Sequence, residues 1–181
     1  MNEFLWLTST DAQVLLELLR GKASKRKLRL FSSACLRDLG RIPEAEIPGR
    51  FADGAATEAD LIAAPHHQGA TTEETWHEAT RACGLPADAL EERRRRCEWL
   101  HDLFGNPFQP QRLDAAWLRW NDGTVRKMAR AIYDENRFVD LPILADTLEE
   151  AGCDELPLLY HCRNGEHWRG CWAVDLLLGM T

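Results

Sequence analysis

Hydrophobic positions recur every three and four residues along most of the chain, the spacing that places them on one face of an α-helix. The clearest stripes lie in residues 11–22, 23–40, 87–105 and 121–137. No run alternates apolar and polar residues for long enough to predict a strand. The pattern therefore predicts an all-α fold, a compact multi-helix bundle of about eight helices.

Short polar residues mark the starts of these helices, because their side-chain oxygens accept hydrogen bonds from the first-turn N–H groups. Thr57 with Asp60 three residues later predicts a capping box, and either Thr71 or Thr72 can cap the next helix. The predicted N-caps are Asp11, Ser24, Thr57, Thr71 or Thr72, Asp114 and Asp122.

The helical pattern weakens between residues 41 and 75, where prolines and glycines are frequent. These residues usually punctuate regular structure. We therefore expect a loop-rich middle at about residues 41–75, with one short helix after Thr57.

Length and composition are those of an ordinary globular protein. A chain of 181 residues fits one domain or at most two tight subdomains, and 45% of its residues are hydrophobic. We expect a single helical domain over residues 1–181. Seven tryptophans are many for this length, and we expect them to form a core and its rim rather than a ligand-stacking surface.

The net charge of −7 argues against a nucleic-acid-binding protein, whose affinity depends on clustered Lys and Arg. The two basic patches, residues 20–29 and 93–96, are interpreted as solvated helix faces. In the second, Glu91 with Arg95 and Glu92 with Arg96 have the i,i+4 spacing of stabilising pairs. Nucleic-acid binding through the first patch stays an alternative.

No stretch approaches the roughly 18 apolar residues of a membrane span. The first residues carry Glu3 and no basic region, which is unlike a signal peptide. We therefore expect a cytoplasmic protein without membrane partners. Disulfides are rare in that compartment, so the six cysteines are expected to be core residues, metal ligands or reactive thiols.

Residues 161–172, HCRNGEHWRGCW, hold the most distinctive chemistry. Cys162, His167 and Cys171 have the spacing C-x4-H-x3-C, and zinc favours four thiolate or imidazole ligands. Asn164-Gly165 would supply a turn between ligands, and the fourth ligand would be His161 or the distant Cys35. The candidate metal ligands are His161, Cys162, His167 and Cys171, with zinc as the cofactor.

Two other interpretations of this segment remain open. No C-x-x-C pair is present, and Cys171 continues an apolar stripe with Val174 and Leu178, which suits a core residue. Alternatively, Cys171 and His167 stand at i,i+4 and would form a Cys/His thiol enzyme, with Arg169 favouring the thiolate. No orienting residue or oxyanion hole accompanies that pair. The remaining histidines, His66, His67 and His77, are expected on the surface.

Several stretches resemble an uncharacterised family of paralogous helical proteins abundant in planctomycetes. They are LLELLRGKASKRKLRLF, LFGNPF, AWLRWNDGTVRKMARAIYDE, LPILADTLEEAGC and RGCWAVDLLLG. The resemblance leaves roughly residues 40–90 uncovered. In the family a cysteine-rich string often follows the Phe of the second helix, whereas this chain keeps only Cys35 there, which weakens a cysteine-based cluster on that helix. No activity is established for the family, so the resemblance implies no reaction.

No phosphate-cradling glycine loop occurs, and no carboxylates have a hydrolase spacing. We therefore expect no enzymatic activity but a small helical module for protein–protein interaction. Its contacts would be exposed tryptophans and the basic second helix, since aromatic and Arg anchors favour such interfaces. The basic residues are Lys22, Lys25, Arg26, Lys27 and Arg29. The alternative functions are a zinc-stabilised domain or a thiol enzyme centred on residues 161–171.

Overall fold

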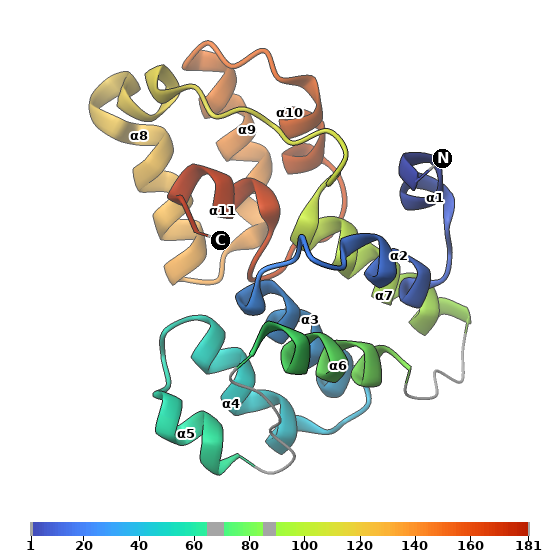
Figure 1. The fold of residues 1–181 in the computed structure, drawn as a ribbon. Coiled ribbons are helices and arrows are strands. Elements are labelled where there is room, and N and C mark those ends of the chain that lie inside the picture. The colour runs from blue at the N-terminus through green and yellow to red at the C-terminus, as the bar shows by residue number, and fades with distance from the viewer. Residues whose placement is uncertain (1, 65–70, 85–89, 181) are drawn as a thin grey trace. The chain divides into compact units, whose positions relative to one another are not determined.

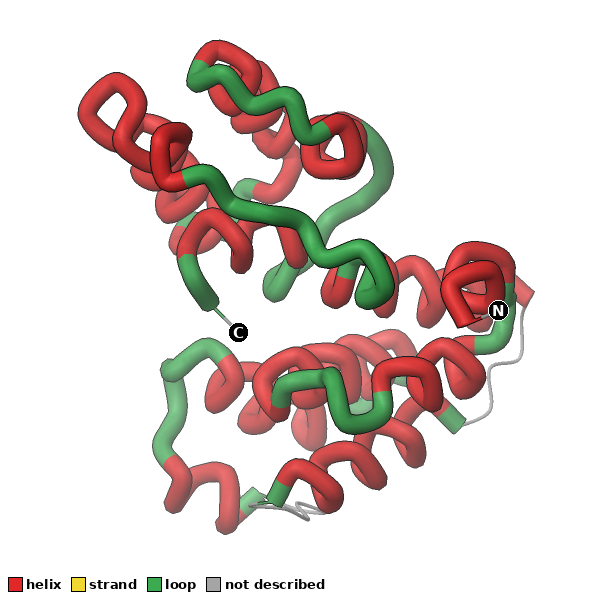
Figure 2. Tube along the Cα trace, turned by 45° about the horizontal axis from the view of Figure 1, so that its top comes forward, coloured by secondary structure: helices red, strands yellow, loops and turns green. Residues whose placement is uncertain are grey.

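The computed structural model describes residues 2–64, 71–84 and 90–180. Its internal contacts divide the chain into two compact units, unit 1 (Met1–Phe108) and unit 2 (Gln109–Thr181). Within the described ranges every regular element is a helix (Figures 1 and 2). The predicted all-α fold is confirmed, with eleven α-helices among the described residues in place of about eight. Whether the units make the single domain expected over residues 1–181 stays a prediction.

Unit 1 is built around α3, which packs against α4, α6 and α7, while α2 packs against α1, α6 and α7 (Figure 1). Its helices are α1 (Asn2–Thr8), α2 (Ala12–Leu19), α3 (Lys25–Asp38), α4 (Ile42–Ala52), α5 (Glu58–Ala63), α6 (Thr72–Cys83) and α7 (Leu90–Phe104). The largest fully buried side chains of this unit are Trp6, Leu15, Leu16, Leu19, Leu28, Phe31 and Leu100.

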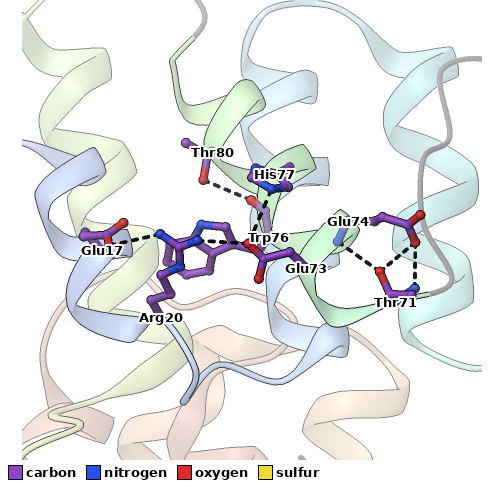
Figure 3. Close-up of polar contacts among 8 residues, drawn as sticks. All are labelled: Glu17, Arg20, Thr71, Glu73, Glu74, Trp76, His77 and Thr80. Atoms are coloured by element: carbon purple, nitrogen blue, oxygen red, sulfur yellow. Dashed lines mark hydrogen bonds and ion pairs between the residues drawn. The ribbon is translucent and has the colours of Figure 1, made fainter.

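The predicted N-caps of unit 1 are confirmed. Asp11, Ser24, Thr57 and Thr71 each accept a hydrogen bond from a first-turn N–H of the helix that follows. The choice between Thr71 and Thr72 is settled by a complete capping box (Figure 3). Thr71 Oγ1 accepts from the Glu74 N–H at 3.2 Å, and the Glu74 carboxylate accepts from the Thr71 N–H at 2.9 Å.

An ion pair joins α2 to the capped helix α6 (Figure 3). Arg20 Nη2 donates to Glu73 Oε1 at 2.9 Å, and its guanidinium lies 5.9 Å from the centre of the Trp76 ring. The Trp76 ring is buried, so the arginine covers the outer edge of this core residue. His77 is exposed, as expected, and lies 3.4 Å from Glu73. The other two histidines of this group, His66 and His67, lie outside the described residues.

The loop-rich interpretation of residues 41–75 is wrong for residues 42–52, which form α4, whereas α5 is the short helix predicted after Thr57. Pro43 stands in the first turn of α4, where its missing N–H costs nothing. Pro48 and Gly49 lie inside α4 and are buried. A Cβ on Gly49 would stand 2.8 Å from Arg37 Nη2 and 3.3 Å from Ser33 Oγ. Proline and glycine here allow α4 to approach α3 closely and do not end the helix.

The solvated-face interpretation of residues 93–96 is wrong for Arg96, which is buried. Its Nη1 donates to the Cys83 carbonyl at 2.7 Å, so the charge satisfies a carbonyl at the end of α6. Arg95 donates to Asp38 of α3 at 2.5 Å. Arg95 and Arg96, which were expected to pair with glutamates of their own helix, therefore form hydrogen bonds with α3 and α6.

Unit 2 consists of α8 (Ala115–Asp134), a 3₁₀ turn (Phe138–Asp140), α9 (Leu141–Glu150), α10 (Leu156–Arg163) and α11 (Trp172–Leu178). Helix α9 packs against α8 and α10, and α11 packs against α8 and α10 (Figure 1). The core contains mainly aliphatic side chains, among them Val125, Ile132, Leu144, Leu148, Leu158, Val174 and Leu177.

Helix α8 is interrupted by non-helical backbone from Trp120 to Gly123. Asp114 caps its first part as predicted, accepting from the Ala116 N–H at 2.7 Å. Asp122 does not have the extended backbone of an N-cap, because its φ is +56°. Its carboxylate instead accepts from Lys127 Nζ at 2.6 Å.

All seven tryptophans are among the described residues, and none of them is exposed. Trp6, Trp76, Trp99 and Trp117 are buried, and the other three are half-buried. The core-and-rim expectation is confirmed. Across the described parts of the chain, no helix combines the length and the apolar character needed to cross a membrane.

Candidate metal centre

Three segments of unit 2 bring His161, His167 and Cys171 together. His161 lies in the last turn of α10, His167 in the connection that follows, and Cys171 directly before α11. Gly165 and Gly170 have φ values of +94° and +92°. Such values suit glycine alone without strain, so the two glycines let the connection fold back and return Cys171 to His161.

The donor atoms of these three residues lie close together. His161 Nε2 is 3.2 Å from Cys171 Sγ, and His167 Nδ1 is 4.0 Å from the same sulfur. The two imidazole centres are 4.6 Å apart, and the rings meet edge to face. One ligand atom from each residue lies within 4.8 Å of the others.

These separations can be compared with those of a tetrahedral zinc site. Zinc bond lengths and tetrahedral angles place sulfur and nitrogen ligands about 3.6 Å apart. The observed 3.2 Å and 4.0 Å lie on either side of that value. Small side-chain rotations would therefore let Cys171, His161 and His167 share one ion. A thiol proton can serve only one imidazole at a time, so an S–H···N bond does not account for the second.

The backbone around Cys171 is held on both sides. Its N–H donates to the Trp168 carbonyl at 2.9 Å, and its carbonyl accepts from the Asp175 N–H at 3.0 Å. The Cys171 side chain is buried, whereas His161 and His167 are half-buried. The soft ligand therefore lies deeper in the unit than the two imidazoles.

Trp172 also belongs to this centre, although sequence reasoning did not assign it a role. Its ring lies 4.8 Å from the His161 ring with a tilt of 41°. This contact limits rotation of the imidazole and thereby directs Nε2 toward Cys171. Only its position beside Cys171 in the sequence hinted at such a role.

Cys162, the remaining predicted ligand, does not join the group. It is buried in the apolar core of unit 2. Neighbouring residues on a helix point in different directions, so when His161 faces Cys171, Cys162 faces the core. Cys35, the other suggested ligand, lies in the core of unit 1, where burial raises the pKa of its thiol far above its usual value.

The structure also locates the predicted interaction residues Lys22, Lys25, Arg26, Lys27 and Arg29, which lie at or just before the start of α3. Lys22 and Lys25 are exposed. Lys22 Nζ lies 4.3 Å from the centre of the Phe108 ring.

Arg26, Lys27 and Arg29 also have partners inside unit 1. Arg26 lies 3.7 Å from Asp53, and Lys27 donates to a carbonyl oxygen of α7. Arg29 is buried with its guanidinium 4.9 Å from the Phe51 ring centre, and burial lowers its pKa. A docking surface made from these five residues would therefore present Lys22 and Lys25 most openly.

The thiol-enzyme alternative draws on the same contact between His161 and Cys171. A nucleophilic thiol must be accessible, but Cys171 is 0% exposed. Arg169 is engaged with Tyr133, donating to its carbonyl at 3.0 Å and lying 4.6 Å from its ring centre. Metal binding is the chemistry that this arrangement fits better.

Comparisons with protein-family models, with curated proteins and with solved structures found no match to the chain.

Proposed function

We propose that unit 2 is a zinc-stabilised helical module in which His161, His167 and Cys171 bind one Zn²⁺ ion. The observation that supports this proposal is the convergence of two imidazoles and one thiol within 4.8 Å. Three protein ligands leave one zinc coordination position for water or a further ligand. Because the ligands come from two helices and their connection, binding would couple directly to the folding of this part of the unit.

The donor set supports zinc over other common ions. Mg²⁺ and Ca²⁺ prefer oxygen ligands, whereas imidazole and thiolate suit Zn²⁺ and other late transition metals.

The function expected from the sequence, a module for protein–protein interaction, receives less support. None of the seven tryptophans is exposed, and Lys22, Arg26, Lys27 and Arg29 contact other residues of unit 1. That module stays a prediction.

Cobalt substitution tests the proposed ligands directly. The metal-free full-length chain is titrated with Co²⁺, and absorption is recorded in the near-ultraviolet and visible regions. A bound thiolate gives a sulfur-to-cobalt charge-transfer band, and tetrahedral geometry gives intense visible bands. We expect both, saturating at one equivalent and disappearing when Zn²⁺ is added.

Cys171→Ser should abolish the charge-transfer band. Cys162→Ser is the matched control, because both cysteines are fully buried in the same core and Cys171 Sγ is the sulfur that lies 3.2 Å from His161 Nε2. This control should keep the band. A wild-type chain without the band at saturating Co²⁺, or a band lost equally in both variants, would contradict the proposal.

A further inference from the structure

The geometry points to Arg163 as the positioning residue of the metal centre: it fixes the last turn of α10 so that His161 faces Cys171. This inference depends on the proposed function, since it assigns a residue that would set the affinity of the same site. Arg163 ends α10 and stands two residues after His161.

Arg163 is held to α9 by three hydrogen bonds. Its Nη1 donates to Glu149 Oε1 at 3.1 Å, and its Nη2 donates to Glu149 Oε2 at 2.5 Å and to Asp146 Oδ1 at 2.7 Å. The guanidinium therefore binds both carboxylate oxygens of Glu149 through its two Nη atoms, and Nη2 also binds Asp146 one turn away. Planar bidentate pairing of this kind defines direction as well as distance.

The two carboxylates raise the pKa of Arg163, and Arg163 lowers the pKa of Glu149. The three charges are solvent-exposed to different degrees, so their contribution to global stability is small. Their effect is to fix the orientation of the last turn of α10.

Local orientation matters because α10 has only eight residues. A helix this short has little stability of its own, and its last carbonyls lack helical partners. Leu158, Leu159 and Cys162 hold its inner face in the core. On the outer face, Asn164 Nδ2 donates to the Tyr160 carbonyl at 2.8 Å, and Arg163 supplies the tie to another helix.

Without Arg163 the last turn of α10 would sample more positions, and His161 would spend less time near Cys171. Partners that support metal ligands typically change metal affinity 10–100-fold, and Arg163 acts through the backbone, so we expect about threefold to tenfold weaker binding. The affinity loss should come with little change in the stability of the metal-free protein.

The test measures Zn²⁺ affinity of the full-length chain by competition with a chromogenic chelator. Arg163→Met removes the charge but keeps much of the side-chain length. Arg163→Lys keeps the charge but lacks the planar pair of nitrogens that binds both oxygens of Glu149. We expect Arg163→Met to weaken binding and Arg163→Lys to recover part of the loss. Asp146→Asn combined with Glu149→Gln should weaken binding as Arg163→Met does.

Arg130→Met is the matched control. Arg130 is also a surface arginine of unit 2 with a carboxylate partner, Asp134 at 3.7 Å, but that pair lies within α8. It should bind zinc like the wild type. Equal weakening in both methionine variants, or wild-type affinity in Arg163→Met, would overturn the inference while leaving the proposed function standing. A wild-type chain that binds no zinc would overturn both.

Discussion

Replacing each of two buried cysteines of unit 2 with alanine separates packing from metal binding. Cys162 and Cys171 are both 0% exposed in the same core, so each substitution removes a similar buried volume. Deleting one small buried group costs about 1 kcal/mol. Cys171→Ala also loses the contact with His161 at 3.2 Å, for which a further loss of about 1 kcal/mol is reasonable. In the metal-free protein Cys171→Ala should therefore be less stable than Cys162→Ala by about 1 kcal/mol.

Zinc binding should separate the stabilities of Cys162→Ala and Cys171→Ala much further. At a free Zn²⁺ concentration of 100 times Kd, a single site in the folded state adds about 2.7 kcal/mol to the free energy of unfolding. For a chain of this size that corresponds to roughly 5–11 °C in Tm. The wild type and Cys162→Ala should gain this shift, and Cys171→Ala should gain almost none.

The assay is thermal unfolding followed by circular dichroism, with chelator and with buffered zinc, for the three proteins side by side. The metal-free curves calibrate the packing cost. Equal zinc shifts for Cys162→Ala and Cys171→Ala would refute the assignment of Cys171 as a ligand, even if the protein binds zinc elsewhere.

Three further predictions concern other features. Thr71→Ala should lower the free energy of unfolding by about 1 kcal/mol in urea titrations, whereas Thr72→Ala should not, because only Thr71 caps α6; equal losses would contradict this. His101 lies 2.9 Å from the Trp6 carbonyl, and burial lowers its pKa. The unfolded state therefore takes up the proton first, so stability should fall as pH drops through the ordinary histidine pKa, and His101→Gln should flatten that dependence in urea midpoints measured across this range. In the native protein, Cys171 should stay unreactive toward a mild thiol reagent and react after unfolding, as followed by mass spectrometry; rapid native labelling would favour the thiol enzyme.

Features determined by local sequence were predictable. Asp11 and Thr71 cap helices because their side chains reach N–H groups two or three residues away, so the sequence contains both partners. The all-α class followed from periodicity for the same reason. Pro48 and Arg96 were misinterpreted because their roles depend on other helices. Pro48 lies inside α4, which packs against α3, and Arg96 donates to a carbonyl at the end of α6.

The candidate metal centre likewise has features that local sequence predicts and features that depend on other helices. The spacing of Cys162, His167 and Cys171 predicted a shared site, with His161 or Cys35 as the fourth ligand. The structure brings His167, Cys171 and His161 together and leaves Cys162 in the core. Adjacency made Cys162 look equivalent to His161, although the two face different sides of α10. The Arg163 contacts with α9 could not be anticipated, since nothing local indicates which carboxylates a surface arginine meets.

Zinc binding is tested most directly by the metal content of the full-length chain after equilibration with Zn²⁺ and removal of excess ion. Native mass spectrometry should show one zinc per chain, and a variant with alanine at His161, His167 and Cys171 should show none. A wild-type chain that retains no zinc, or a triple variant that retains it in full, would contradict zinc binding by these three residues.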